Sequence, residues 1–397
     1  MVYINQLSYR DTWAEISLDH IKNNFLQFRQ FVHPHAKIMA VVKADGYGHG
    51  AIEIAKTAIE AGADYLAVAL VDEAIKLRLS GITQPILVLG YTPTRSIRAA
   101  ILENITLTVF DHEVLDEVIV QTDSLSKTAS IHLKIDTGMS RIGVTSSDDA
   151  LILAKKAMEA TNVCLEGVFT HFANADSENS DLTYAQFNKF QSIVEYLENN
   201  CIYIPIKHCC NSAATMKFPE MHLDMVRIGV SLYGLYPDDS LKNHSIQLKQ
   251  AMTFKTKIAA IKKVAASQAI SYGWTWKPER VSLIATLPLG YADGLSRLLS
   301  NRGKVLIHGQ KSAIAGRVCM DQTMIDITDI QNCSVGDVVT IFGESCSSFQ
   351  SIDEIAHLMG TINYEVVCLI GKRVPRVYDN YNELFKPAKN VQSNILF

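Results

Sequence analysis

The first part of the chain repeats one pattern, in which a short apolar run bounded by turn residues is followed by a helix-length amphipathic segment. Continuous apolar runs are typical of parallel strands buried on both faces, and each parallel pair needs a crossover connection. Eight such units predict an α/β fold with an N-terminal (β/α)8 barrel. A doubly wound open sheet is the alternative, but no glycine-rich dinucleotide fingerprint follows the first run. The predicted strands are Ile38–Lys43, Tyr65–Leu70, Pro85–Gly90, Ile105–Phe110, Ile131–Asp136, Leu165–His171, Ile204–Asn211 and Asp224–Val230.

The pattern changes after about residue 245, where short apolar runs alternate with turns and predict a C-terminal, mostly-β domain. A chain of 397 residues is long enough for two domains. We expect the barrel to span residues 1–245 and the β-rich domain residues 246–397, with Pro237–Gln247 as a polar linker. The predicted helices of the barrel include Ala51–Ala61, Val71–Leu79, Asp148–Ala160 and Tyr184–Glu198, and the predicted strands of the second domain are Ala251–Ala260, Val281–Leu287, Lys304–Ile307, Met324–Ile327 and Val338–Ile341.

Charge and hydropathy exclude two classes of partner. The 37 Lys and Arg residues against 41 Asp and Glu residues give a formal net charge of -4. The chain therefore lacks the basic excess that binding to a nucleic-acid backbone requires. No apolar run reaches the length of a signal-peptide core or a membrane span. We therefore expect a cytoplasmic protein that has neither nucleic acid nor membrane as a partner.

The 8 cysteines are scattered and form no C-x-x-C pair, which argues against a zinc site or a disulfide framework. Cys209 and Cys210 adjoin His208 and could suggest metal ligands. On a strand, however, adjacent side chains point to opposite faces and cannot converge on one ion. We expect buried free thiols there and no metal site.

Lys43 ends the first predicted strand, after Val41 and Val42 and before a glycine-rich turn that runs to Gly50. The active site of a (β/α)8 barrel lies at the C-terminal ends of its strands, so Lys43 is expected at the barrel mouth. The alternative is a surface lysine that caps a strand. The apolar run before Lys43 instead favours a desolvated amine with a lowered pKa, which Schiff-base chemistry requires.

Charged residues follow the later predicted strands as well. Taken alone, His171 could be a satisfied core histidine and Arg141 a solvated loop residue. So many charges in one barrel mouth are costly unless they pair with each other or with a ligand, so together they predict a ligand site. The set comprises Lys134, Arg141, His171, His208 and Arg227.

The turns after the seventh and eighth strands are where barrels commonly bind a phosphate. Asn211 and Ser212 follow the seventh strand, and Gly229 and Val230 lie at the end of the eighth. They supply a hydroxyl group and closely approaching backbone amides, which suit an anion.

The segment Ala40–Gly50 resembles the pyridoxal-phosphate attachment segment of alanine racemases, which are fold-type III enzymes. Similar segments recur in the same order along nearly the whole chain. This resemblance implies a barrel with a β-rich second domain, pyridoxal 5'-phosphate as cofactor and racemisation of alanine as the activity. The further matching segments are Lys134–Gly143, Gly167–His171, Asn211–Thr215, Val226–Pro237, Ser271–Gly273, Gly290–Gly294, Gly316–Gln322 and Thr361–Val366.

The resemblance implies two acid/base groups, Lys43 and Tyr272, which act on opposite faces of the substrate α-carbon. Lys43 would also bind the cofactor covalently. Arg227 would contact the pyridine nitrogen, with His208 behind it. A guanidinium keeps its proton, so the ring nitrogen would stay unprotonated and the ring would be a restrained electron sink that favours reprotonation over transamination.

The remaining implied roles concern binding and access. Arg141 would hold the cofactor oxygen and the substrate carboxylate, and Met320 would hold the carboxylate through its backbone, supported by Cys319 and Asp321. In many members the lysine that matches Lys134 is carbamylated and braces the arginine, and the sequence alone leaves this state open here. The other cofactor contacts would be Tyr47, His171, Asn211, Ser212, Gly229, Val230 and Tyr364, and the entry corridor would comprise Asp176, Tyr291, Arg297 and Ile362.

The same family implies a homodimer with shared active sites, because its second domain covers the barrel mouth of the partner. Two positions depart from the usual pattern: Cys209-Cys210 stands where small residues are common, and Gly371-Lys372 replaces a serine-containing pair. Neither touches a proposed catalytic group.

Three alternatives differ in class. A broad-specificity racemase on the same fold would accept larger or basic amino acids. Such members are often exported, whereas we expect no signal peptide in this chain. A decarboxylase on a related architecture would pair the pyridine nitrogen with a carboxylate, where this chain offers Arg227. A cofactor-binding carrier would lack Tyr272 and the second domain. The resemblance points to D-alanine supply for peptidoglycan, although the sequence does not separate this role from amino-acid catabolism.

Overall fold

The computed structural model describes residues 9–378, which fall into two compact units. One unit is His20–Gln250. The other combines the described residues up to Asp19 with those from Ala251 onward. This division differs from the two continuous segments expected from the sequence, because the N-terminal strand belongs with the β-rich unit.

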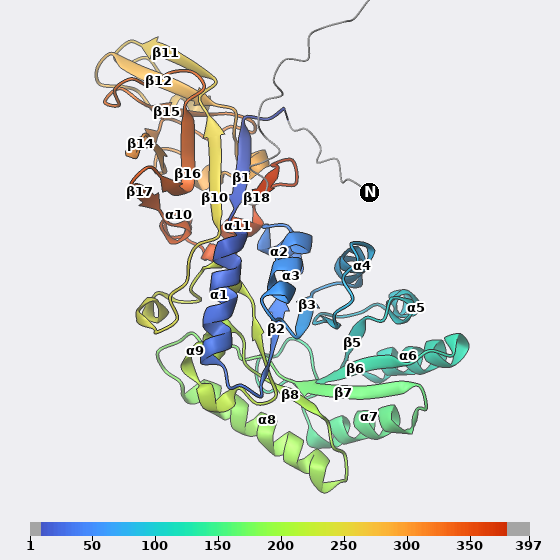
Figure 1. Cartoon of the computed structure of the whole chain (residues 1–397). Helices are drawn as coiled ribbons and strands as arrows, with labels where there is room; N and C mark the ends of the chain where they lie inside the picture. The colour runs from blue at the N-terminus through green and yellow to red at the C-terminus, as the bar shows by residue number, and fades with distance from the viewer. Residues whose placement is uncertain (1–8, 379–397) are drawn as a thin grey trace, which may run out of the picture. The chain divides into compact units, whose positions relative to one another are not determined.

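The unit His20–Gln250 contains the predicted parallel barrel (Figure 1). Its sheet has the order β8-β7-β6-β5-β4-β3-β2-β9, and every pair is parallel. Backbone hydrogen bonds from Asp224 N to Lys207 O and from Arg227 N to Cys210 O join β9 to β8 at the ends of this order. The strands are β2 (Lys37–Val41), β3 (Tyr65–Val68), β4 (Ile86–Val88), β5 (Thr106–Val109), β6 (Ala129–Lys134), β7 (Val163–Phe169), β8 (Ile206–His208) and β9 (Met225–Ile228).

Helices separate these strands and bury their apolar faces. Side chains cap several of them: Asp111 accepts from Val114 N, and Ser146 accepts from Asp149 N, at 2.8 and 3.1 Å. The helices are α1 (Leu18–Phe31), α2 (Lys43–Tyr47), α3 (Ala51–Glu60), α4 (Val71–Leu79), α5 (Thr94–Leu102), α6 (His112–Leu125), α7 (Ser147–Glu159), α8 (Asp181–Asn199) and α9 (Ser212–Lys217), with short 3-10 turns η1 (Pro219–Met221), η2 (Val230–Tyr233) and η3 (Asp239–Asn243).

The other unit is mostly β, as predicted. Its sheet has the order β11-β12-β15-β14-β13-β16-β10-β1-β18, with β17 paired to β16. The strands are β1 (Thr12–Ile16), β10 (Met252–Lys257), β11 (Ala260–Val264), β12 (Ser282–Leu287), β13 (Lys304–Ile307), β14 (Gln310–Ile314), β15 (Thr323–Asp326), β16 (Val338–Ser345), β17 (Ser348–Gln350) and β18 (Arg376–Tyr378); the helices are α10 (Ile352–Met359) and α11 (Asn363–Cys368), with 3-10 turns η4 (Tyr272–Trp274), η5 (Tyr291–Asp293) and η6 (Arg297–Leu299).

β1 is an interior strand of this sheet, antiparallel to β10 and parallel to β18. Its side chains alternate, with Thr12, Ala14 and Ile16 buried. The hydroxyl oxygens of Thr12 and Thr256 lie 2.8 Å apart and form a buried hydrogen bond. A strand from one end of the chain thus completes a sheet made by the other end.

All eight cysteines are free, and Cys209 and Cys210 are buried, as expected. The geometric reason given from the sequence was wrong. β8 ends at His208, so the strand alternation does not extend to the two thiols. Their sulfur atoms lie 4.0 Å apart, and both thiols donate to Met221 O. Among residues 9–378, no helix is both long and apolar enough to span a membrane.

Candidate active site

Lys43 follows β2 at the barrel mouth and begins a turn of unusual backbone geometry. Ala44, Asp45 and Tyr47 have φ of 53°, 54° and 50°, in the left-handed region. This conformation costs non-glycine residues roughly 1–2 kcal/mol each. The turn is held from outside, because Glu73 accepts a hydrogen bond from Ala44 N at 2.7 Å. The sequence prediction placed Lys43 correctly at a strand end but did not identify Glu73.

Tyr47 is buried inside this turn, and its ring packs against Tyr233 at a centroid distance of 4.9 Å. The hydroxyl of Tyr233 donates to Val41 O at 2.9 Å, which ties the turn to the end of β2. A Cβ atom on Gly229 would lie 2.9 Å from the hydroxyl oxygen of Tyr47. Glycine at position 229 therefore allows the Tyr47 hydroxyl to approach the backbone after β9.

Ser212 also contacts the backbone at Gly229, because its hydroxyl accepts a hydrogen bond from Gly229 N at 2.9 Å. Val230 follows Gly229 and begins η2. Asn211 caps α9, where its side-chain oxygen accepts from Ala214 N. The structure therefore brings Tyr47, Ser212, Gly229 and Val230 together, whereas the side chain of Asn211 makes a helix cap.

Arg227 is a buried cation on β9. Its guanidinium donates to the backbone oxygens of Thr170 and Cys209, both at 2.9 Å. It also contacts the Nδ1 atoms of His208 and His171, at 2.9 and 3.2 Å. Burial lowers the pKa of Arg227 to about 10, which still leaves it protonated near neutral pH. No carboxylate of residues 9–378 pairs with it.

The hydrogen bonds fix the proton positions on the imidazoles behind Arg227. A guanidinium can only donate, so Nδ1 of His208 must be the acceptor and its Nε2 must carry the proton. That Nε2 lies 2.9 Å from Nδ1 of His132, whose Nε2 lies 3.4 Å from the Glu166 carboxylate. Burial lowers the pKa of both histidines, most strongly for His208. The connection from Arg227 to Glu166 thus consists of two neutral rings.

Glu166 ends this buried network on β7. Its other carboxylate oxygen accepts from the Tyr65 hydroxyl at 2.6 Å. The hydrogen bond from His132 is the main cause of its lowered pKa. His132, Glu166 and Tyr65 were missed from the sequence. The available signal was a charged residue inside the otherwise apolar stretch Leu165–His171.

Lys134 ends β6, is buried and makes no ion pair with any described residue. Its Nζ atom lies 4.2 Å from the centre of the Phe169 ring, and the side chain is buried. Burial, followed by the charges of Arg227 and Arg141, lowers the pKa of Lys134 far below its usual value. These surroundings therefore favour loss of the proton from the Lys134 amine. Lys134 and Arg141 line one small pocket together with His171.

Asp136 shapes the loop that carries Arg141. Its carboxylate accepts hydrogen bonds from the backbone N–H groups of Gly138, Ser140 and Arg141, at 2.9, 3.1 and 3.0 Å. Burial raises the pKa of Asp136, but these donors outweigh it and lower the pKa overall. The sequence signal for this role was the Asp-Thr-Gly turn after a strand.

In the β-rich unit, Tyr272 has a side chain that is 70% exposed. Ser271, just before it, donates to Arg317 O at 2.6 Å and lies 3.6 Å from the Cys319 sulfur. Gly290 packs so closely on this segment that a Cβ atom would lie 2.3 Å from Met320 O. The predicted residues Tyr272, Cys319 and Met320 therefore belong to one cluster of loops, next to Tyr291.

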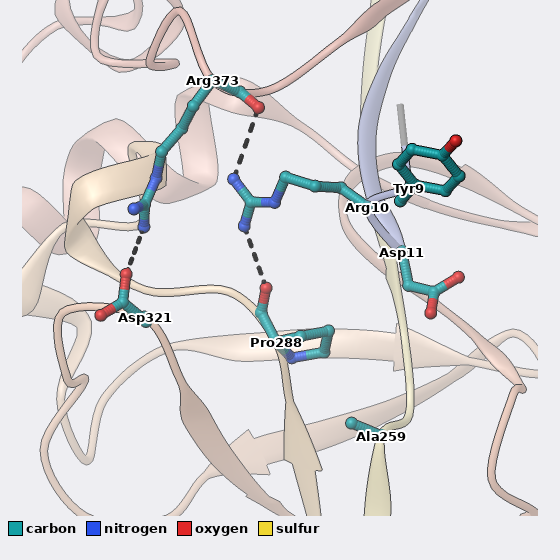
Figure 2. A pocket seen from close by; sticks show the side chains of 7 residues that line it. All are labelled: Tyr9, Arg10, Asp11, Ala259, Pro288, Asp321 and Arg373. Carbon is teal, nitrogen blue, oxygen red and sulfur yellow. Dashed lines mark hydrogen bonds and ion pairs between the residues drawn. The ribbon is translucent and has the colours of Figure 1, made fainter. Parts of the chain in front are cut away.

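A buried carboxylate, Asp293, lies beside this cluster and accepts a hydrogen bond from Gly290 N. Arg10 and Arg373 both bind its Oδ1, at 2.5 and 2.7 Å. Figure 2 shows the two guanidinium groups in one pocket and the second contact of Arg373, to Asp321 at 2.6 Å. Asp321 follows Met320, so Arg373 fixes the segment that would present the Met320 backbone.

The other predicted site residues are described by their element and exposure. Arg297 is exposed in η6, and Ile362 is exposed just before α11, which contains Tyr364. Asp176 is exposed in the loop before α8 of the barrel unit. The predicted site thus consists of a barrel set and a β-rich set, one in each unit.

The family models of known proteins match most of the chain. Residues 16–237 match the alanine racemase N-terminal domain, and residues 251–378 match the alanine racemase C-terminal domain. The chain belongs to the alanine racemase family. This confirms the family that the sequence motifs indicated.

Individual members of the alanine racemase family are similar over nearly their full length. Alanine racemase 2 of Oceanobacillus iheyensis is 55% identical over 95% of this chain and 96% of its own. The crystal structure of alanine racemase from Bacillus anthracis with bound L-Ala-P has a TM-score of 0.89 at 40% identity, covering 93% of this chain and 95% of its own. Histidine racemase from Leuconostoc mesenteroides has a TM-score of 0.86 at 29% identity, covering 93% and 98%.

Enzymes of the alanine racemase family depend on pyridoxal phosphate, and the barrel mouth of this chain fits that group. It contains an amine at Lys43 and two hydroxyl groups around the glycine backbone at 229. A Cβ atom at Gly229 would fill the space that separates it from Tyr47. Arg227 provides a buried cation whose Nε–H has no acceptor among the described residues. An amine, an anion cradle and an unshared cationic donor are the groups that an aldehyde-bearing pyridine phosphate requires.

Proposed function

We propose that this chain is an alanine racemase that interconverts L-alanine and D-alanine with pyridoxal 5'-phosphate as cofactor. The observation that carries the proposal is the environment of Arg227. All its described acceptors are backbone carbonyls or neutral imidazoles. A cation rather than a carboxylate at the position of the ring-nitrogen partner supports racemisation over decarboxylation.

The chain's own residues would hold the cofactor in the barrel mouth. Lys43 would bind it covalently, Arg227 would donate to its ring nitrogen, and His171 would lie beside the ring. Tyr47, Ser212 and the backbone of Gly229 and Val230 would hold its phosphate, with Asn211 shaping the turn and Tyr364 as a further contact. When bound, the cofactor supplies an electron sink that acidifies the α C–H bond of the amino acid.

Lys43 and Tyr272 would move the proton. Racemisation needs one group to remove a proton from one face of the α-carbon and another to return a proton to the opposite face. Lys43 Nζ would act on one face and the Tyr272 hydroxyl on the other, with the roles reversed for the other enantiomer. Tyr272 lies in the β-rich unit, which supports a homodimer in which each site takes Lys43 from one chain and Tyr272 from its partner.

Arg141 and the Met320 backbone would bind the substrate carboxylate. Lys134, at the end of β6, supports a further role: once its buried amine has lost its proton, it would add carbon dioxide and release a second proton to solvent, leaving a carbamate anion. The carbamate anion would lie near the positive charges of Arg141 and Arg227, which already lower the pKa of Lys134. A carbamate NMR signal from protein grown with 13C-bicarbonate, lost in Lys134→Ala, is the expected observation.

The direct test is to incubate the purified protein with single enantiomers of several amino acids and to follow their chirality. L-alanine and D-alanine should each converge on the racemic mixture. Borohydride reduction followed by peptide mapping should place the pyridoxyl label on Lys43. A label on another lysine would exclude the proposed attachment site, and release of carbon dioxide in place of racemisation would support a decarboxylase.

A second candidate is a racemase for larger or basic amino acids. The similarity to a histidine racemase supports keeping it in the test. Faster racemisation of histidine, lysine or arginine than of alanine would favour this candidate. The entry-corridor residues Asp176, Tyr291, Arg297 and Ile362 are where we expect such specificity to differ.

In the cell, we propose a cytoplasmic enzyme that supplies D-alanine for peptidoglycan. A strain that lacks this chain should then require D-alanine for growth, provided that it has no second alanine racemase. A requirement that appears only with alanine as the carbon source would instead indicate catabolism.

A further inference from the structure

A cluster of three different metal-ligating side chains lies in the β-rich unit, apart from the proposed active site. His308, Cys333 and Asp337 each offer one ligand atom, and these atoms all lie within 4.8 Å of one another. His308 Nε2 and Asp337 Oδ2 are 3.1 Å apart. Within residues 9–378, this is the one group of three or more His, Cys, Asp or Glu side chains with such spacing.

The backbone places His308 by a tight turn. β13 and β14 pair Ile307 with Gln310, so His308 and Gly309 form a two-residue hairpin loop. Their φ values of 49° and 76° are both positive, as a type I′ turn requires. β13 also pairs with β16, with Ile307 opposite Val339, and this antiparallel register brings the turn to the residues just before β16.

The loop that carries Cys333 and Asp337 is held by its own hydrogen bonds. Asp337 Oδ2 accepts from Ser334 N at 2.8 Å. The backbone of Gly336 and Asp337 exchanges hydrogen bonds with Ile258, at 2.8 and 2.9 Å. The three candidate metal ligands therefore come from a hairpin turn and an anchored loop. Binding an ion would order few additional groups.

The chemistry of the set selects the metal. Imidazole nitrogen, thiolate sulfur and carboxylate oxygen are the ligands that zinc accepts, at about 2.0–2.3 Å. One thiolate and one carboxylate together would balance the charge of a divalent cation.

We propose that His308, Cys333 and Asp337 form a three-ligand Zn²⁺ site with a fourth position open to water. The ion would join the β13–β14 turn to the loop before β16 and so stabilise the β-rich unit. The site is independent of the proposed racemase activity, because none of its ligands belongs to the barrel set or to the loops around Tyr272.

Thiol protection tests the site within one protein. The full-length enzyme is alkylated with iodoacetamide, with and without one equivalent of Zn²⁺, and each cysteine is quantified by peptide mass spectrometry. Zn²⁺ should slow the alkylation of Cys333 at least tenfold. It should leave Cys201 unchanged, because that thiol is exposed just after α8 in the barrel unit. Equal alkylation of Cys333 with and without Zn²⁺ would overturn the proposal.

Variants provide the second measurement. Calorimetric titration of the full-length enzyme with Zn²⁺ should give one site, and the ion should raise the melting temperature. Cys333→Ser and His308→Gln should each weaken binding at least tenfold and abolish the thermal shift, whereas Cys201→Ser should behave like the unsubstituted protein. Binding that is equally strong in Cys333→Ser and Cys201→Ser would show that the ion binds elsewhere and would exclude this site.

Discussion

Arg227 donates to two backbone carbonyls and contacts two imidazoles, and none of these acceptors carries a negative charge. Isolated charges are expensive to bury, so a cation in such surroundings needs another source of compensation. The nearest carboxylate in the network is Glu166, two imidazole rings away. This arrangement keeps the guanidinium available as a donor to a ligand without making it part of a salt bridge.

The charge of Arg227 gives the first prediction. Arg227→Glu should lower racemisation at least a hundredfold, or roughly 2.7 kcal/mol in activation free energy. A carboxylate would let the ring nitrogen hold a proton, so transamination to pyruvate should rise relative to racemisation. Both products are measured from D-alanine. Arg95→Glu, on the exposed side of α5, is the matched control. A rate within threefold of the unsubstituted enzyme would show that Arg227 does not serve the ring.

Glu166 gives the second prediction. The hydrogen bond and the charge of Glu166 raise the pKa of His132, opposing the larger effect of burial. Glu166→Gln should therefore lower the pKa of His132 further, which 15N NMR titration of the ring reports even without cofactor. The free energy of unfolding should fall by about 1–3 kcal/mol, because a charge-assisted hydrogen bond is weakened. The exposed Glu178→Gln is the control, and an unchanged His132 titration would contradict the proposed network.

At the scale of secondary structure, the sequence predicted the barrel strands well. Each apolar run was short, and each was followed by a turn. β1 was missed because its five residues are mixed in polarity and its partner Thr256 lies 244 positions away. β18 is three residues long and pairs with β1 alone. Such strands are determined by long-range pairing, which local patterns do not encode.

The candidate site divides in the same way. Residues at strand ends, such as Lys43 and Arg227, were predictable because barrel topology fixes their position. The residues that orient them were not. Glu73 contacts Ala44 from another helix, and His132 reaches His208 across β7, so both depend on side-chain contacts between elements. The left-handed run after Lys43 was also not predicted, since Ala44 and Tyr47 disfavour that conformation.

The buried histidines of β6 and β8 give the third prediction. His132 and His208 have lowered pKa values in the folded protein, so below about pH 6.5 the unfolded chain binds more protons than the native state. Above that pH, the protonation of these two histidines should not lower the free energy of unfolding. That free energy should fall by about 1.4 kcal/mol per pH unit for each histidine as the pH decreases toward the folded-state pKa.

Urea unfolding between pH 6.5 and 5.0 measures this slope. His132→Asn should reduce the loss per pH unit by about the contribution of one histidine, whatever its effect on stability at pH 7.5. His112→Asn, at an exposed position at the start of α6, should leave the slope unchanged. Equal slopes in both variants would show that the buried imidazoles do not control acid stability.

β1 gives the fourth prediction. Ala14 is fully buried, and its N–H donates to Pro375 O at 3.0 Å. Ala14→Pro should remove this hydrogen bond in an interior strand and lower the free energy of unfolding by at least about 3 kcal/mol. Tyr9→Pro, at a residue that is 96% exposed, should change little. Thermal melting followed by circular dichroism compares them, and similar melting temperatures would contradict the interior position of β1.

At the scale of the whole molecule, β1 belongs to the β-rich unit, the barrel unit follows it in the sequence, and the remaining strands of the β-rich sheet come last. β1 can pair with β10 and β18 only after residues 252–378 exist. The barrel unit can form earlier, because all its strands lie between Lys37 and Ile228. We therefore expect the barrel to fold first during synthesis, since pairing across long sequence separations is slow.

The same division bears on catalysis, because Lys43 belongs to one unit and Tyr272 to the other. In the proposed homodimer, Lys43 of one chain meets Tyr272 of the partner. Lys43→Ala and Tyr272→Phe proteins should each be nearly inactive. A mixed dimer would then contain one site that lacks both groups and one site with both intact.

Subunit exchange between the two inactive variants is therefore the fifth prediction. Random mixing makes about half of the dimers mixed, and half of their sites are intact, so roughly a quarter of the unsubstituted activity should return. Each variant mixed with itself under the same conditions is the control and should stay inactive. If Lys43 and Tyr272 came from one chain, every site would lack one of them whatever the pairing. Mixing would then restore nothing, even though exchange had occurred, which mass spectrometry of the intact dimers can establish separately.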